Sequence, residues 1–348
     1  MATDAVTATV ATLRQREARR ASAGLWRDAL WRLRRDPTTL IALTVIGVMV
    51  ILALAAPLLG DGFFHKTERD QDILSNYTKP TFAQPWLWLG TDELGRSQIV
   101  RLLFGARVSL FIGSFGALTA LVIGLGMGVT AGYFRGRWDD IVVWLVTTLN
   151  SVPLLYLLLI IGVLFRLEPL PFAVLLGGLG WLGIANYARG QTISLREREY
   201  VLAGRTVGCT PVRLMVRHIV PNILPLMIVL GMIEVGQLIL TESAISFIGF
   251  GIQPPTPSWG NMLTNASQYL GKAPYLIYPP GVAVFVTVLC LYLIGDGLRD
   301  ALDPRLRAGS ESRPEGRDGG DRRGQGLAGG TASQGLVHGR AGGPHGRG

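Results

Sequence analysis

The chain is poor in charged residues and in cysteine. Of its 348 residues only 16% are Asp, Glu, Lys or Arg, while 49% are hydrophobic. Soluble domains carry about 25% charged residues, so this composition argues against a soluble protein and indicates a membrane protein. The two cysteines are Cys209, in a polar loop, and Cys290, in an apolar segment. Because they would lie in different phases, they predict neither a disulfide framework nor a metal site.

The sequence also lacks the short motifs of common enzymes. It contains no G-x-x-x-x-G-K-[ST], no H-E-x-x-H and no G-x-S-x-G, and its four histidines are scattered. We therefore expect no catalytic residue, no metal site, no cofactor and no phosphate loop in this chain. The net charge of +9 does not predict nucleic-acid binding, because most arginines fall in segments expected to be cytoplasmic.

Long apolar runs are the main positive feature. A membrane-spanning helix takes about 20 residues, and six runs reach that length: 38–60, 108–134, 141–165, 170–188, 221–251 and 273–295. The first run is longer than the core of a signal peptide, about 7–15 residues, so it predicts an uncleaved helix. The sequence predicts an all-α membrane protein with six transmembrane helices.

The distribution of arginine predicts the orientation of these spans. Residues 1–37 and the loop 189–220 are rich in arginine, whereas the loop 252–272 has one lysine and no arginine. Because positive residues concentrate in cytoplasmic loops, both termini are expected in the cytoplasm. The predicted organisation is a cytoplasmic tail (1–37), a first helix (38–60), an extracytoplasmic loop (61–104) and a core (105–305) that contains the other five helices. A cytoplasmic tail (306–348) with almost no aliphatic residue is expected to be disordered.

The cytoplasmic loop 189–220 carries helix punctuation. A helix is expected from about 196 to 207, with Gly208 as its stop. Thr210 is a good N-cap and Pro211 a good first residue, so a second helix should begin there. A helix–Gly–helix elbow between two spans is suited to transmit force from a soluble partner.

Four further patterns are candidate functional features, and each leaves two interpretations open. Small residues at every fourth position of the second span, which are Gly116, Ala120, Gly124, Gly128 and Gly132, could pack against a partner subunit or inside this one. Polar residues beside Pro153 in the third span, Asn150 among them, suggest a kink beside a polar pathway or a kink healed by local hydroxyls.

In the fifth span, Glu234, Gln237, Thr241 and Glu242 share one helical face. Carboxylates are costly in a bilayer, so this stripe should line a translocation route or make a buried hydrogen bond to a neighbouring helix.

The outer loop combines Pro254 and Pro255 with Trp259. It should be stiff, with the indole available at the membrane face, and is a docking or gating element or else a cap over the bundle.

From about residue 90 to 305 the chain resembles the C-type permease subunit of dipeptide, oligopeptide and nickel ABC importers. The matching segments, in order, are GTDELGRS (90–97), RLLFGARVSL (101–110), AGYFRGRWD (131–139), EYVLAGRTVG (199–208), RHIVPN (217–222), ESAISFIGFGIQPPTPSWGNML (242–263) and GDGLRDALDPR (295–305). Seven segments in order make the resemblance specific.

The resemblance implies a type I ABC importer transmembrane domain in the bacterial inner membrane. Implied partners are a second, similar permease subunit, two ATPase subunits that bind the ATP, an extracytoplasmic solute-binding protein and the surrounding lipid. In such importers the elbow docks on the ATPase. By resemblance, this contact involves Glu199, Ala203, Gly204, Arg205 and Gly208.

The chain departs from the family pattern at two places. The coupling stretch usually reads E-A-A, but here it reads Leu202-Ala203-Gly204. Since Gly costs about 1 kcal/mol relative to Ala in a helix, this coupling helix is expected to be looser. Trp144 and Thr147 stand where the family commonly has an Arg and an Asp.

Two other functions are alternatives to an importer permease. One is a self-contained secondary transporter or channel that uses the Glu234–Glu242 stripe, and the other is a membrane-anchored scaffold.

Overall fold

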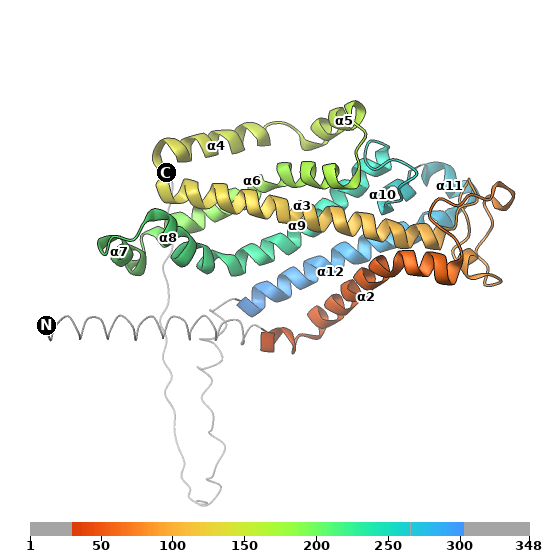
Figure 1. The fold of residues 1–348 in the computed structure, drawn as a ribbon, viewed down its shortest axis with the longest axis horizontal. Helices are drawn as coiled ribbons and strands as arrows, with labels where there is room; N and C mark the ends of the chain where they lie inside the picture. The colour runs from red at the N-terminus through yellow and green to blue at the C-terminus, as the bar shows by residue number, and fades with distance from the viewer. Residues whose placement is uncertain (1–29, 265, 303–348) are drawn as a thin grey trace, which may run out of the picture. The chain divides into compact units, whose positions relative to one another are not determined.

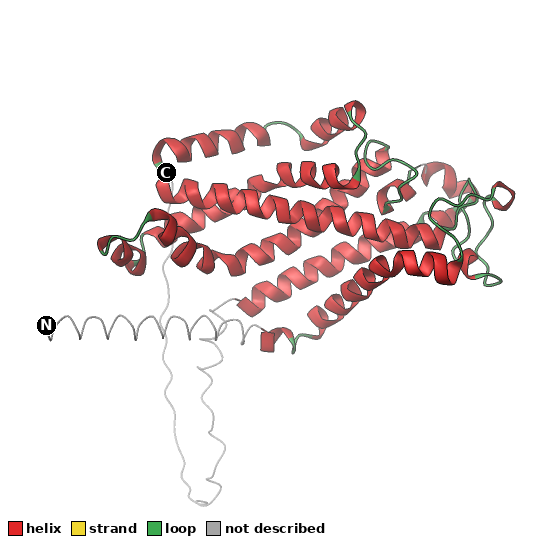
Figure 2. Ribbon diagram, viewed as in Figure 1, coloured by secondary structure: helices red, strands yellow, loops and turns green. Residues whose placement is uncertain are grey.

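The computed structural model describes residues 30–264 and 266–302, and its regular elements there are helices (Figure 2). The main helices are α2 (Pro37–Leu59), α3 (Gln98–Phe134), α4 (Gly136–Asn150), α5 (Leu154–Leu164), α6 (Pro169–Arg196), α7 (Glu199–Thr206), α8 (Pro211–Leu214), α9 (Val220–Ile248), α10 (Trp259–Met262), α11 (Ala266–Lys272) and α12 (Tyr278–Leu302). Shorter 3₁₀ or π turns are η1 (Gly60–Phe64), η2 (Ile73–Ser75), η3 (Pro85–Leu87), η4 (Met215–Ile219) and η5 (Pro274–Leu276). The predicted all-α class is confirmed for these residues.

Five helical segments are long and apolar enough to cross a membrane. They are Pro37–Phe64, Gln98–Phe134, Pro169–Arg196, Pro211–Ile248 and Pro274–Leu302. A sixth span is formed if α4 and α5, which meet at a bend of 76°, are taken together. The six predicted runs therefore correspond to five continuous spans and one broken span.

The break in the third span falls beside Pro153, as the sequence predicted. α4 ends at Asn150, and Pro153 directly precedes α5. Proline lacks the N–H that would continue the helix and disfavours a helical residue before it. The carbonyl of Leu149, four residues before Pro153, instead accepts from the N–H of Val152 at 3.2 Å, and the hydroxyl of Ser151 donates to the carbonyl of Thr147 at 2.9 Å. Local groups thus satisfy the backbone at the break.

Helix α3 lies in the middle of the bundle, against α6 and α9, while α12 lies beside α9 and α2 (Figure 1).

The small-residue strip of α3 allows the backbone of α6 to approach closely. A Cβ atom built on Gly128 would lie 2.4 Å from the carbonyl oxygen of Ala185, and one on Gly116 would lie 3.1 Å from that of Ala173. The strip therefore packs inside this subunit, so its interpretation as a surface for a partner subunit is wrong.

Helix α3 begins at Gln98, well before the predicted starts of the second span at residue 108 and of the core at residue 105. Ser97 caps it, with its side chain accepting from the N–H of Val100. The first turns were missed because Arg101 and Arg107 interrupt the apolar run. Arg101 is nevertheless buried, beside the carboxylate of Asp92.

The segments at the two ends of the bundle differ in character. At one end, α7 and α8 form the elbow between α6 and α9; at the other lie the long loop before α3 and the short helices α10 and α11 (Figure 1). The predicted disordered tail, 306–348, and most of the predicted N-terminal tail lie outside the described residues.

Candidate functional site

The elbow is built as the sequence predicted, with one difference in extent. Gly208 ends the first arm with φ +84°, a left-handed conformation that glycine adopts without steric penalty. Its N–H donates to the carbonyl of Arg205 at 2.9 Å. Thr210 then caps α8, whose first residue is Pro211. The expected helix 196–207 is split, however, because α6 ends at Arg196 and α7 starts only at Glu199.

Gly204 is the residue that closes the elbow. A Cβ atom at this position would lie 2.7 Å from Cδ2 of Leu214, and Leu214 is fully buried. Val201, one turn before Gly204, is also fully buried. The absence of a side chain at Gly204 therefore lets α7 approach α8 closely. The expectation that glycine makes this helix looser did not consider this contact, and it stays a prediction.

Two arginines attach the elbow to the end of α3 through Tyr133. The guanidinium carbon of Arg205 lies 5.0 Å from the centroid of the Tyr133 ring, within the range of a cation–π contact. Arg196 donates from Nη1 to the carbonyl oxygen of Tyr133 at 2.7 Å. Tyr133 itself is 7% exposed. Arg205, predicted by resemblance to contact an ATPase, thus makes an intramolecular contact that fixes the arm.

A second ion pair holds the elbow end of α6 against α4. Arg189 donates from Nη2 to Oδ2 of Asp139 at 2.7 Å and from Nε to Oδ1. Such a forked pair fixes orientation as well as distance. Together with the contacts of Tyr133, it makes the elbow an extension of the bundle instead of a free loop.

The elbow exposes large apolar side chains as well as basic ones. Glu199 and Ala203 are exposed. Five large apolar side chains are also exposed there: Tyr200 (43%), Leu202 (45%), Val207 (84%), Val212 (63%) and Val216 (63%). We call these five residues the elbow patch. Partial burial raises the pKa of Tyr200, so its hydroxyl stays neutral over the physiological range. An apolar cluster on a polar loop is typical of a protein-binding surface.

The polar stripe of α9 is divided between a buried and a more accessible environment. Successive residues of an α-helix are about 100° apart, so Glu242 points about 80° away from Glu234. Glu242 is fully buried, and its carboxylate accepts from the hydroxyls of Ser109 (3.0 Å) and Ser246 (2.8 Å). Its placement in an open pathway is therefore wrong for this subunit; the buried hydrogen-bond alternative describes it.

The remaining pathway candidates are accessible to different degrees. Gln237 and Asn150 are exposed, and Glu234 and Thr241 are partly buried. Glu234 lies against α6, where a Cβ atom on Gly180 would meet its Oε1 at 2.5 Å. Their part in translocation stays a prediction.

The outer loop also differs from the expectation. Pro254 and Pro255 are exposed, but Trp259 is 1% exposed. The indole Nε1–H donates to the carbonyl of Leu102 (3.1 Å), and the backbone N–H of Trp259 donates to the hydroxyl of Ser109 (3.2 Å). The indole is thus a buried anchor between α10 and α3. Its expected position at the membrane face is wrong because the loop folds back over the bundle.

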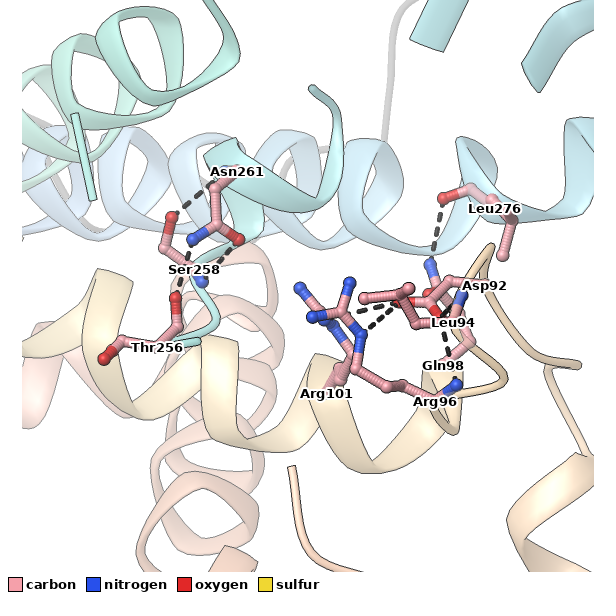
Figure 3. A network of polar contacts seen from close by, with 9 residues as sticks. All are labelled: Asp92, Leu94, Arg96, Gln98, Arg101, Thr256, Ser258, Asn261 and Leu276. Atoms are coloured by element: carbon pink, nitrogen blue, oxygen red, sulfur yellow. Dashed lines mark hydrogen bonds and ion pairs between the residues drawn. The ribbon is translucent and has the colours of Figure 1, made fainter. Parts of the chain in front are cut away.

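Sequence reasoning missed a buried ionic cluster in the segment before α3. Asp92, Arg96 and Arg101 are 6%, 8% and 4% exposed, respectively (Figure 3). Asp92 accepts from Nε of Arg96 at 2.7 Å. The signal was present, since all three residues lie in or beside GTDELGRS, but the sequence analysis placed them in the extracytoplasmic loop 61–104 and assigned them no role. Gly95, at φ +70°, makes the turn that brings Arg96 back to Asp92.

The long apolar helices and the broken span define a polytopic helical membrane protein. The chain matches the model of the binding-protein-dependent transport system inner membrane component over residues 124–308. It also matches the N-terminal TM domain of oligopeptide transport permease C over residues 24–80. The chain belongs to this family of ABC transporter permease subunits.

Similar proteins include three curated transport permeases. The chain is 35% identical to the oligopeptide transport system permease protein OppC of Haemophilus influenzae, over 81% of this chain and 89% of that protein. It is 34% identical to the dipeptide transport system permease protein DppC of Alkalihalophilus pseudofirmus, covering 81% and 91%. It is 32% identical to the glutathione transport system permease protein GsiD of Pectobacterium atrosepticum, covering 87% and 98%. The chain is therefore a multi-pass protein of the inner membrane type, from a family of transporters and not of enzymes.

Proposed function

We propose that this chain forms half of the translocation pathway of an ATP-driven importer and that the elbow couples it to an ATPase subunit. The observation that carries the proposal is the exposed elbow patch on an arm braced by Arg205 and Tyr133. An exposed apolar surface on a rigid arm can transmit a displacement, whereas a flexible loop would absorb it. ATP would be bound by the partner subunits, since no phosphate loop occurs in this sequence.

The proposed partners follow from this role. A second permease would complete the pathway, two ATPases would bind ATP, and a solute-binding protein would deliver the ligand at the loop end of the bundle. The family is named for binding-protein-dependent transport, which supports the last partner. Positive-inside loops support placing the elbow and both termini in the cytoplasm.

We propose short peptides as the transported solutes. The support is that the similar proteins are named as permeases for oligopeptides, dipeptides or glutathione. Asn150, beside the break in the third span, and the Glu234, Gln237 and Thr241 face of α9 are the proposed pathway residues. A deletion strain fed labelled di-, tri- and pentapeptides, with nickel as a separate substrate, tests this choice. Uptake of nickel but of no peptide would overturn it.

Coupling is tested at the elbow patch. Val207 is 84% exposed, so Val207→Asp should leave the fold intact while placing a charge in the docking surface. We expect ATPase co-purification to fall by about tenfold or more, since burying an unpaired charge at an interface costs several kcal/mol. Leu74→Asp is the matched control, because Leu74 is 98% exposed in the loop at the other end.

If Val207→Asp retained full co-purification and full ATP-dependent uptake, the elbow would not be the ATPase contact. A single chain that moved solute in vesicles without ATP or companions would overturn the importer role altogether.

A further inference from the structure

A cavity of about 180 Å³ lies between the segment before α3 and the outer loop. Its lining includes Asp92, Arg96 and Arg101 on one side, and Asn261 and Tyr269 on the other. It is separate from the elbow and from the proposed pathway residues of α9, and no step described so far uses it. Figure 3 shows how the two arginines and Asp92 lie relative to the turn that contains Ser258 and Asn261.

The buried charges around this cavity do not balance. Oδ1 of Asp92 accepts from the N–H groups of Leu94 and Arg96, each at 3.0 Å, and Oδ2 accepts from Nε of Arg96 at 2.7 Å. One buried carboxylate therefore serves two buried guanidinium groups. Glu93 also lines the cavity, but its side chain is exposed to solvent.

Arg101 is the group left over. Its Nη1 lies 3.3 Å from Oδ2 of Asp92 but makes no hydrogen bond within the described part of the chain. The side chain is 4% exposed, so most of its charge is removed from water. Guanidinium stays protonated in proteins, and a buried charge without hydrogen bonds is costly. An anion that accepts a hydrogen bond from Nη1 would lower this cost.

The chemistry of the lining suits a carboxylate. A planar guanidinium matches a carboxylate through two parallel hydrogen bonds. The phenol of Tyr269 lies in the same lining. Burial raises the pKa of Tyr269 to about 12, so the phenol keeps its proton and adds no competing negative charge. Asn261 is already committed, since its amide nitrogen donates to the carbonyls of Ile252 (3.1 Å) and Thr256 (2.7 Å).

The size of the cavity limits what can enter. A dry cavity of about 150 Å³ accommodates one benzene ring, and pockets for whole small-molecule ligands are about 300–1,000 Å³. A single acidic side chain fits a volume of 180 Å³. This volume is below the usual range for whole ligands, so a single side chain is the better fit.

We propose that this cavity is a docking socket for one acidic side chain, Asp or Glu, of the solute-binding protein, with Arg101 as the anchoring cation. The proposal rests on the proposed function, because that function supplies a binding protein at this end of the bundle. In the docked state the carboxylate bonds Nη1 of Arg101. Docking thereby supplies the hydrogen bond that Arg101 lacks within its own chain.

The test uses the complete reconstituted complex in nanodiscs and its purified binding protein. The dissociation constant is measured for the wild type, Arg101→Gln and the matched control Arg107→Gln, whose arginine lies on the same helix but is exposed. We expect Arg101→Gln to weaken docking at least about tenfold, as loss of a charge-assisted pair does. Arg107→Gln should stay within about twofold.

A second measurement needs no variant. Acetate at 50–100 mM, compared with chloride at equal ionic strength, should compete with docking to the wild type if a carboxylate occupies the cavity. Should Arg101→Gln fail to assemble, this competition decides the question alone. Lack of competition by acetate in the wild type would overturn the proposal.

Other outcomes separate the sources of the carboxylate. If Arg101→Gln raises the KM for peptide while docking is unchanged, the peptide's own carboxylate is the occupant and the proposal fails. If docking and KM both match the wild type in a folded complex, the cavity has no ligand and the proposal fails. If the binding protein does not dock on the wild type, the proposed function itself has failed, and this result is distinguishable from the others.

Discussion

Arg205 lies over the ring of Tyr133, with its guanidinium carbon 5.0 Å from the ring centroid, and so connects the elbow to the end of α3. The contact matters because the elbow must move as one body with the helices if it is to transmit a displacement. It also shows that one arginine of the elbow, Arg205, contacts a residue of its own subunit.

The first prediction concerns this contact. Arg205→Gln should loosen α7 against the bundle by about 0.5–2 kcal/mol, the value of a cation–π pair. Amide hydrogen exchange of residues 199–206 should become faster, and transport per ATP hydrolysed should fall. Arg198→Gln, at an exposed position of the same elbow, should leave exchange unchanged. Equal exchange in the two variants would show that Tyr133 does not hold the arm.

The second prediction concerns the turn of the elbow. Gly208 has φ +84°, and a Cβ atom there meets nothing within 4 Å, so only the backbone opposes substitution. Gly208→Ala should destabilise the elbow by about 1–2 kcal/mol, the cost of a left-handed residue with a side chain. Gly190→Ala is the matched control, because that helical glycine has open space and an ordinary φ. It should be neutral or slightly stabilising, and thermal loss of bound ATPase measures the difference.

The third prediction concerns the small-residue strip of α3. In Gly128→Ala the new Cβ would lie 2.4 Å from the carbonyl oxygen of Ala185, so α6 would have to move. Overpacking of this kind costs about 1–3 kcal/mol. Gly126→Ala, on the same helix, has open space and should be tolerated. The thermal midpoint of the isolated subunit in detergent is the measurement.

If Gly128→Ala left that midpoint unchanged and instead prevented pairing with the second permease, the strip would be an intersubunit surface after all. The close contacts with Ala185 argue for the opposite result.

The fourth prediction concerns Glu242. Glu242→Ala would leave the hydroxyls of Ser109 and Ser246 without their acceptor, at about 1–3 kcal/mol for each unsatisfied group. Glu242→Gln keeps one acceptor oxygen and should retain most of the stability. Thr241→Ala, one residue away and partly exposed, should barely change it. A stable Glu242→Ala protein with abolished uptake would return Glu242 to the pathway.

Local features of the sequence were sufficient to predict the spans and the elbow. Pro153 marked the break between α4 and α5, and Gly208 with Thr210 and Pro211 marked the turn between α7 and α8. These features depend on the conformational limits of single residues, which no distant contact can remove. The family segments were equally local, and the family assignment that they predicted is confirmed.

The candidate site was less predictable, because burial depends on partners far apart in the chain. Trp259 was expected at the membrane face, but its backbone N–H donates to the hydroxyl of Ser109. Arg101 was expected in a loop, but its guanidinium lies beside the carboxylate of Asp92. Neither spacing nor composition reveals such pairs, and charge alone made Arg101 look like a loop residue.

The sequence by itself determined the all-α class, the positions of the long apolar helices, the break at Pro153 and the helix–Gly–helix elbow. Each of these follows from apolar length or from the backbone preferences of proline and glycine. Only the tertiary structure decided that the glycine strip packs inward, that Glu242 is buried among serines and that Arg101 is left without a hydrogen-bond partner in the described residues. Those outcomes depend on which helices meet and at what distance, and a helical face in isolation does not specify its neighbour.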